Sequence, residues 1–489
     1  MCKKLDWEKL LCGERERHSY SKDDNKFDIG DERYDHRNEF DKDYDRIVYS
    51  SSVRRLQDKA QVFPLQENDF TRTRLTHSIE VSALGRSLGY AIGKWLQHKQ
   101  QFSNEQTTEI SALLQVAAII HDLGNPPFGH YGEEVIGNWF KNWFSSEQYK
   151  DIEKSYDLNK RLNNQQKSDF INFEGNAQTL RIVSKLQILN DRYGVNFTYG
   201  TLATIIKYPW NSESNMCKNN KGKFGYFSSE QDLVERIQEK TGLIDGVKHP
   251  VTFLLEAVDD MAYLVADIED AVKKGILSWD KEYNSIKNNL LKNTNDQYKD
   301  IFEKLDEKNK KSRENKIPNT ELVEFQNFKV FIQGLMFKSV VKTFKDNYEE
   351  IMTGKYKGEL LKDSKVYDII KELKRLAREY CFKNKEVMTL ELVGDNVIKG
   401  LLNKFVNPLA KYNVDIDGKH YEGKLYELIS SNFKYVCCLN KENTEKVILR
   451  DFNDIGLYER LLLITDFISG MTDSYAVNLY KKLLGVKLS

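Results

Sequence analysis

The sequence His121-Asp-Leu-Gly-Asn-Pro-Pro-Phe-Gly-His130-Tyr-Gly-Glu133 closes a long apolar stretch of this 489-residue chain. The adjacent histidine and aspartate at its start offer two metal ligands side by side. A second histidine and a carboxylate follow nine and twelve residues after His121. This spacing predicts a metal centre with an acid/base pair beside it, and therefore a metal-dependent hydrolase if the chain supplies further ligands.

The residues before this stretch indicate what would hold it. Residues 107–122 are apolar on nearly all sides of a helix, which is typical of a helix buried in a large core. His121 and Asp122 stand at its end, where a rigid helix would present both side chains to a cavity. The pair Pro126-Pro127 predicts a turn directly after them, because a helix interior tolerates proline poorly.

The remaining sequence predicts an all-α fold. Only seven prolines occur in 489 residues, and helical patterns run through residues 73–97, 175–190, 251–274 and 455–485. A turn signal at Asp417-Gly418 predicts one small β-hairpin. No internal repeat and no linker divides the chain, so we expect one continuous globular unit with helical insertions. Its expected parts are a charged N-terminal arm at 1–45, a catalytic core at 46–275, a polar helical insertion at 276–330 and a C-terminal helical part at 331–489 that completes the pocket.

Charge and hydropathy exclude several classes of protein. Lys+Arg and Asp+Glu both number 74, so no global basic field indicates nucleic-acid binding. No apolar run approaches the roughly 18 residues that a membrane helix needs. The six cysteines have neither CxxC spacing nor the density of a disulfide framework, and the charged N-terminus lacks the apolar stretch of a signal peptide. We therefore expect a cytoplasmic protein without a membrane span.

Two further ligands complete the predicted metal site. His77 lies early in an apolar-periodic helix, directly after two arginines, whereas the other histidines lie in polar or loop sequence. Asp259, Tyr263 and Asp267 are spaced i, i+4 and i+8 on an otherwise apolar helix and share one face. Such polar groups are costly to bury without partners, so they are expected to line a polar cavity, and the fourth ligand is expected to be a carboxylate of residues 256–270.

These blocks together resemble the HD-domain phosphohydrolases, and specifically the bacterial deoxyguanosinetriphosphate triphosphohydrolase (dGTPase) family. A bare His-Asp pair is weak support, but the extended block from His121 to Glu133 is specific. The resemblance covers most of the chain and includes residues 54–65, 72–78, 172–178, 207–210, 223–227 and 256–270. It implies an all-α HD-domain fold.

The resemblance also implies roles for individual residues. The metal ligands would be His77, His121, Asp122 and Asp259. The catalytic pair would be His130 and Glu133. Sugar contacts are implied for Gln61, Tyr263 and Asp267, the last near the 3′-hydroxyl. Phosphate contacts are implied for Arg74, Lys207 and Lys223. Further pocket residues would be Asn176 and Tyr208, and the base would touch Phe382 and Glu391.

The implied activity is metal-dependent hydrolysis of dGTP to deoxyguanosine and inorganic tripolyphosphate. The cofactor would be a divalent ion, Mn²⁺ or Mg²⁺, with other transition metals also compatible with mixed His/carboxylate ligands. Three alternatives stay open. They are a dNTP triphosphohydrolase of broader specificity that a nucleotide activates, another HD phosphohydrolase acting on monophosphates or alarmones, and a non-catalytic nucleotide- or DNA-binding regulator. By resemblance we also expect a homo-oligomer, commonly a hexamer, and single-stranded DNA as a modulator.

Overall fold

The computed structural model describes residues 4–17, 35–63, 65, 71–189, 191–294, 297–440 and 447–486. The all-α expectation is confirmed, because helices connected by turns make up the described parts of the chain. Two isolated β-bridges, Arg15 with Thr198 and Leu439 with Leu449, occur among the described residues, and no extended sheet forms there. Within these described ranges, no helix is both long and apolar enough to span a bilayer.

The chain forms two compact units, each assembled from separated stretches of sequence. Unit 1 comprises residues 1–4, 61–118 and 250–390, and unit 2 comprises residues 5–60, 119–249 and 391–489. The segments expected from composition are contiguous, so they do not coincide with these units.

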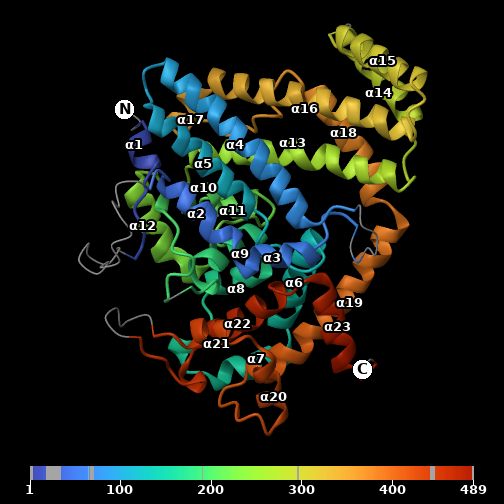
Figure 1. The fold of residues 1–489 in the computed structure, drawn as a ribbon. Helices are drawn as coiled ribbons and strands as arrows, with labels where there is room; N and C mark the ends of the chain where they lie inside the picture. Colours follow the sequence, from blue (N-terminus) through green and yellow to red (C-terminus); the bar gives the residue numbers. More distant parts are fainter. Residues whose placement is uncertain are drawn as a thin grey trace. The chain divides into compact units, whose positions relative to one another are not determined.

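Unit 1 is built around helix α13, Pro250–Lys273, which packs against α4, Arg74–His98, and α16, Thr320–Asp346 (Figure 1). Most of α13 is buried, which explains its nearly continuous apolar sequence. The remaining helices of the unit are α14 (Trp279–Asn293), α15 (Lys299–Glu314), α17 (Tyr348–Met352), α18 (Tyr367–Leu376) and the π-helix η6 (Ala377–Phe382), with the beginnings of α5 (Asn104–Ile120) and α19 (Lys385–Leu409).

Small residues on α4 let it approach α5 closely. A Cβ added at Gly89 would lie 2.8 Å from both the carbonyl oxygen of Ile110 and the Cα of Ser111. Gly85 and Gly93, one turn to either side, face the same helix, with added-Cβ contacts of 3.2 Å and 3.0 Å at their nearest. The glycine stripe therefore sets the packing of the helix that carries His77.

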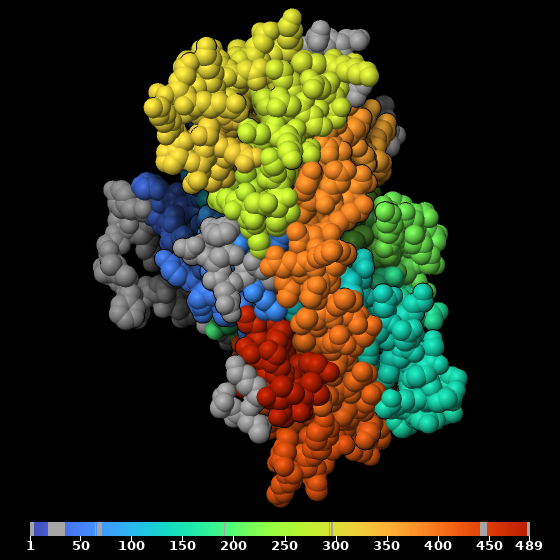
Figure 2. Space-filling model, turned by 90° about the vertical axis from the view of Figure 1, so that its right-hand side faces the viewer, coloured from blue at the N-terminus to red at the C-terminus, as the bar shows by residue number. Residues whose placement is uncertain are grey.

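The polar sequence at 276–330 forms helices with a buried seam. Trp279 is fully buried and meets the rings of Phe325 and Phe328 at centroid distances of 4.7 and 4.8 Å. Helix α15 packs against α16, and Figure 2 shows residues 279–292 and 299–314 together on the surface. The expected helical insertion is thus fixed by a few aromatic anchors beneath a charged exterior.

Unit 2 contains most of the short helices. They are α1 (Trp7–Leu10), α2 (Glu39–Val48), α3 (Ser51–Arg55), η2 (Leu56–Asp58), α6 (Gly129–Phe144), α7 (Glu147–Ser155), η3 (Leu158–Lys160), α8 (Asn164–Ile171), α9 (Gly175–Arg181), η4 (Ile182–Leu186), α10 (Tyr199–Ile205), α11 (Asn215–Asn219), η5 (Ser228–Glu230), α12 (Gln231–Thr241), α20 (Tyr421–Leu428), α21 (Ser431–Cys438), η7 (Phe452–Asp454), α22 (Leu457–Ser469) and α23 (Asp473–Leu483). The unit also holds the end of α5 and most of α19.

A buried ion-pair network joins three elements of unit 2. The guanidinium of Arg181, at the end of α9, donates to Asp466 on α22 at 2.7 Å and to Glu230 on η5 at 2.9 Å. All three side chains are almost fully enclosed. Losing one partner would leave a buried charge uncompensated, so the network couples the placement of these helices.

The described parts of the expected N-terminal arm are folded. Helix α1 buries Trp7 and Leu10, and Arg15 forms ion pairs with Asp43 and Glu39 of α2. Residues 18–34 of that arm lie outside the described residues. Charge density alone therefore did not distinguish a solvated arm from a segment that packs on the protein through ion pairs, as the described residues before 18 do.

The predicted β-hairpin at Asp417-Gly418 is wrong. The carboxylate of Asp415 accepts from the amide of Asp417 at 3.1 Å, and that of Asp417 accepts from the amide of Lys419 at 2.9 Å. Gly418 has a φ of +78°. Consecutive side-chain-to-backbone turns satisfy these amides locally, so the turn signal was real but no strands flank it.

Candidate metal centre and catalytic pair

Two of the predicted metal ligands, His77 and Asp259, lie on helices of unit 1. Thr73 caps α4 by accepting from the amide of Thr76, and this places His77 in the first turns of the helix. His77 is fully buried, and its Nε2 lies 3.1 Å from Oδ1 of Asp259 on α13. The structure thus brings together these two predicted ligands, which are 182 residues apart in sequence.

The face of α13 that holds Asp259, Tyr263 and Asp267 is acidic, and these side chains are buried or half-buried. Burial, and then the neighbouring carboxylates of Asp260 and Asp259, raise the pKa of Tyr263. Burial, and then the charge of Asp270, raise the pKa of Asp267 well above its ordinary value, while Arg72 opposes this shift. A cationic or hydrogen-bond-donating ligand would relieve this accumulation of negative charge.

Two arginines flank the start of α4. Arg72 donates to Asp270 at 2.7 Å and to Glu269 at 2.5 Å, so it fastens the loop before α4 to α13. Arg74, the first residue of α4, is buried although it was predicted to meet a phosphate. Sequence reasoning assigned no role to Arg72, whose nearness to Arg74 was the available signal.

The other two predicted ligands, His121 and Asp122, lie in unit 2. They come directly after the last residue of helix α5, and Nε2 of His121 lies 3.6 Å from Oδ2 of Asp122. The amide of Asn125 donates from Nδ2 to Oδ1 of Asp122 at 2.5 Å, which orients the carboxylate. The side-chain atoms that were predicted to bind a metal therefore lie close together in this pair.

The proline turn leads into α6, which carries the predicted catalytic pair. The helix begins at Gly129 after Phe128, a non-glycine residue with a φ of +63°. Nδ1 of His130 lies 3.0 Å from Oε2 of Glu133, one turn further along. The His130 side chain is 78% exposed whereas that of Glu133 is 5% exposed. A buried carboxylate thus orients an accessible imidazole.

Glu133 belongs to a buried charge cluster that includes Lys223. Nζ of Lys223 lies 3.2 Å from Glu133 and also forms an ion pair with Glu174. Burial would raise the pKa of Glu133, but the hydrogen bond with His130 and the charges of His130 and Lys223 hold it below its ordinary value. Burial and the neighbouring Glu133 raise the pKa of Glu174 instead.

Glu174 contacts two of the predicted site residues, Lys223 and Asn176, although sequence reasoning assigned it no role. It caps α9 by accepting from the backbone amide of Asn176, whose side-chain amide also donates to it at 2.5 Å. Lys223, predicted to bind phosphate, is here held between Glu174 and Glu133. The signal was the block Asn172-Phe-Glu174-Gly-Asn176, in which a carboxylate precedes a short helix.

The other predicted pocket residues of unit 2 lie on connected loops. Nζ of Lys207 is 5.9 Å from the ring centroid of Tyr208, and that ring lies 5.8 Å from Trp210. The indole of Trp210 donates to the carbonyl of Lys223 at 2.8 Å. These contacts link the loop at 207–210 with the loop that carries Lys223.

The remaining predicted substrate contacts are Gln61, Phe382 and Glu391. In unit 1, Oε1 of Gln61 is buried without a hydrogen-bond partner among the described residues, and Phe382 is half exposed at the end of η6. In unit 2, burial and then Glu134 raise the pKa of Glu391. The sugar contact of Gln61 and the base contacts of Phe382 and Glu391 stay predictions.

Comparison with known proteins finds relatives that are similar over nearly the whole chain. The HD domain family model matches residues 74–187. A deoxyguanosinetriphosphate triphosphohydrolase-like protein of Listeria monocytogenes is 38% identical over 499 residues, spanning 99% of this chain and 100% of the relative. A similar protein of Synechocystis is 31% identical, with 92% and 95% covered. The deoxyguanosinetriphosphate triphosphohydrolase of Serratia proteamaculans is 31% identical, with 94% and 96% covered. The chain therefore belongs to the deoxyguanosinetriphosphate triphosphohydrolase family of the HD-domain superfamily.

Proposed function

We propose that this protein hydrolyses dGTP to deoxyguanosine and inorganic tripolyphosphate with a divalent metal ion. The observation that carries the proposal is the buried Glu133 holding the exposed imidazole of His130, in a chain whose relatives are named for this reaction. The pair offers a proton donor with an ordinary pKa near neutrality. Attack of water at the α-phosphorus would expel the 5′-oxygen of the nucleoside, a poor leaving group that needs such a proton.

The residues suited to hold the metal are His77, His121, Asp122 and Asp259. Two imidazoles and two carboxylates form a donor set that Mn²⁺ accepts readily and Mg²⁺ less so. Within each pair the ligand atoms face one another, at 3.1 Å for His77 and Asp259 and at 3.6 Å for His121 and Asp122. A divalent ion bound there would supply Lewis-acid stabilisation of the negative charge on the α-phosphate.

Basic side chains would balance the charge of the substrate. A triphosphate carries about four negative charges, and the acidic face of α13 cannot compensate them. Arg74, Lys207 and Lys223 are the proposed phosphate contacts. Lys223 is ionised between two carboxylates that hold its pKa above the ordinary value. A phosphate oxygen would replace one of these partners without a change in protonation.

The proton transfer follows from the orientation of His130. Its Nδ1 faces Glu133, so Nε2 is the nitrogen proposed to protonate the leaving 5′-oxygen. Glu133 stays ionised because its neighbours hold its pKa low, and it would stabilise the imidazolium before transfer. Glu133 would also restore the same ring orientation after each turnover.

Recognition of the nucleoside would use side chains from the remaining predicted set. For the sugar and the pocket wall we propose Gln61, Tyr263, Asp267, Asn176 and Tyr208. For the base we propose Phe382 and Glu391. The half-buried ring of Tyr263 would lie against the 2′ side of the sugar and leave no room for a 2′-hydroxyl.

Product analysis tests the proposal. The purified protein is incubated with dGTP, dATP, dCTP or dTTP, singly and in pairs, with Mn²⁺ or Mg²⁺. Tripolyphosphate and deoxyguanosine should form from dGTP alone, and chelation of the metal or Asp122→Ala should abolish the reaction. His98→Ala, which changes an exposed histidine at the end of α4, serves as the matched control. Release of pyrophosphate, or of phosphate only, would refute the proposed reaction. Turnover of dGTP only with a second nucleotide present would refute activity without an activator.

A further inference from the structure

The turn from Asn125 to Phe128 connects the two chemical halves of the motif in unit 2. At its start, Asn125 donates to the carboxylate of Asp122. At its end, Phe128 in its left-handed conformation precedes the first residue of α6, and His130 follows two residues later. The conformation of these four residues therefore sets where the imidazole of His130 lies relative to Asp122.

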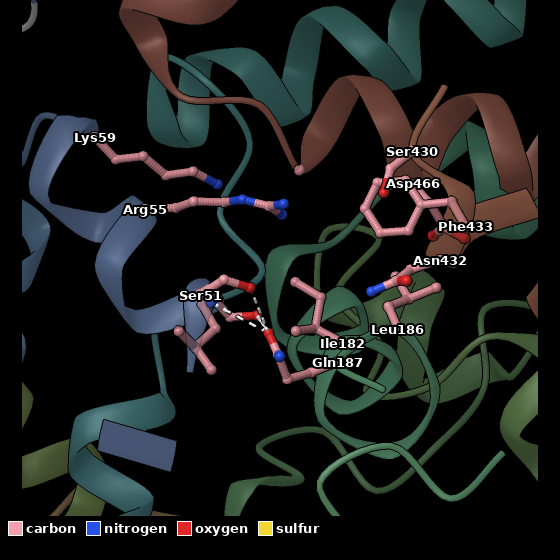
Figure 3. Close-up of a pocket in the computed structure, with 13 residues that line it drawn as sticks. Ser51, Arg55, Lys59, Ile182, Leu186, Gln187, Ser430, Asn432, Phe433 and Asp466 are labelled. Carbon is pink, nitrogen blue, oxygen red and sulfur yellow. Dashed lines mark hydrogen bonds between the residues drawn. The ribbon is translucent and has the colours of Figure 1, made fainter. Parts of the chain in front are cut away.

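A buried lysine holds the first end of this turn. Lys59 follows helix η2, and the residue is 3% exposed. Its Nζ donates to the backbone carbonyl of Asn125 at 2.5 Å and to that of Ser469 at 3.2 Å. Figure 3 shows Lys59 beside Arg55, at a cavity of about 30 Å³ that Leu123 also lines. An ammonium group is costly to bury without hydrogen-bond partners, and these two backbone carbonyls accept from it.

A buried aspartate holds the other end. Asp473 is the first residue of α23, and its Oδ1 accepts a hydrogen bond of 3.0 Å from the backbone amide of Phe128. Its Oδ2 accepts a hydrogen bond of 2.9 Å from the backbone amide of Ala60. Because Ala60 follows Lys59 directly, one short segment and one carboxylate together clamp both ends of the turn. The ring of Phe128 packs on Gly394, where an added Cβ would lie 2.6 Å from it.

We infer that Lys59 and Asp473 are positioning residues for the reaction, acting through the turn on Asp122 and His130. The inference rests on the proposed function, since it assigns His130 and Asp122 their roles there. Misplacement of a reacting group by about 1 Å costs on the order of 100-fold in rate. Groups that orient metal ligands typically contribute about 10- to 100-fold to activity or metal affinity. Substrate contacts made elsewhere would be spared.

The test compares Lys59→Met and Asp473→Asn with the wild type. Met keeps the length and apolar volume of the lysine stem but cannot donate. Asn keeps one acceptor and turns the other oxygen into a donor that faces an amide. Both variants should lose about 10- to 100-fold in kcat per folded molecule, with KM changed less than about threefold. The matched control is Arg460→Met, because Arg460 is fully buried and donates to the carbonyls of Lys411 and Phe452 instead. It should lose stability while keeping kcat.

A second readout separates this inference from the proposed function. Amide hydrogen exchange in a peptide covering residues 124–132 reports the turn without any substrate. Exchange there should be at least about tenfold faster in both clamp variants and unchanged in Arg460→Met. A kcat near that of the wild type in the folded variants, an equal loss in Arg460→Met, or unchanged exchange would overturn the inference. If the wild type made no tripolyphosphate, the proposed function would fail. The exchange result alone would then show whether Lys59 and Asp473 hold the turn.

Discussion

At the scale of single residues, the clearest feature is the contrast between Glu133 and His130. A carboxylate that is almost fully enclosed is expensive to keep ionised unless cations compensate it. Glu133 has two such neighbours, His130 and Lys223. The protein thus maintains a buried negative charge whose main effect is on an imidazole at the surface, which is typical of a group selected for chemistry rather than for stability.

Replacing His130 tests this assignment. His130→Ala should reduce kcat about 100- to 10,000-fold, the usual contribution of a general acid. Binding of dGTP, measured by calorimetry with Ca²⁺ in place of the catalytic ion, should change little because the exposed ring is not proposed to bind phosphate. A variant with unchanged turnover would rule out the chemical role.

Tyr263 is expected to control sugar selection. Tyr263→Ala should let the enzyme hydrolyse GTP, because it removes the ring that would exclude a 2′-hydroxyl. Tyr263→Phe keeps the ring and loses only the hydroxyl, so it should still reject GTP. Steady-state kcat/KM for dGTP and GTP gives the comparison. If the alanine variant discriminates as well as the wild type, the steric account fails.

Residue spacing predicted part of the site and not the rest. The i, i+4, i+8 pattern of Asp259, Tyr263 and Asp267 located one helix face, because helical geometry is regular and local. Glu174 and Lys59 carried no comparable signal. A lysine in a charged stretch looks solvated, and only the folded chain shows that its ammonium reaches a backbone carbonyl more than 60 residues away.

At the scale of elements, the packing of α4 on α5 positions His77. Gly89→Ala should destabilise the protein by roughly 1–3 kcal/mol, since the new methyl would overlap the backbone of Ile110 and Ser111. Gly334→Ala is the matched control in the same unit. It lies on the exposed side of α16 with nothing within 4 Å of an added Cβ, so it should stabilise by about 0.5–1 kcal/mol. Urea unfolding measures both, and two changes of the same sign would contradict the packing argument.

Element prediction succeeded where a pattern was long and failed where it was short. Helices α4, α5 and α13 follow from extended apolar periodicity, because many residues repeat the same signal. The expected hairpin at Asp417-Gly418 rested on one turn signal, and side-chain-to-backbone turns satisfied its amides without strands. The π-helices η4 and η6 follow α9 and α18 and had no sequence signal at all.

At the scale of the whole molecule, stability should depend on pH through His249. This side chain is buried between Leu10, whose carbonyl lies 3.2 Å from Nε2, and Thr204. Burial lowers its pKa to about 4, although the hydrogen bond with Leu10 opposes the shift. Between pH 6.5 and pH 4 the unfolded chain therefore binds a proton that the folded chain does not, so the free energy of unfolding falls as the pH falls.

The expected size of this effect follows from the shift. His249 should cost about 2 kcal/mol of unfolding free energy between pH 7.5 and pH 5. Urea unfolding at both values, for the wild type and His249→Gln, gives the contribution as the difference between the two pH dependences. The exposed His98→Gln should keep the pH dependence of the wild type. A His249→Gln variant that also kept it would show that this histidine is not the titrating group.

The central claim is that water attacks the α-phosphorus of dGTP. Turnover of dGTP in H₂¹⁸O with Mn²⁺, followed by mass spectrometry of both products, tests it most directly. The account predicts one ¹⁸O atom in tripolyphosphate and none in deoxyguanosine, because the bond between C5′ and O5′ stays intact. Label in deoxyguanosine, or labelled pyrophosphate formed together with dGMP, would contradict it.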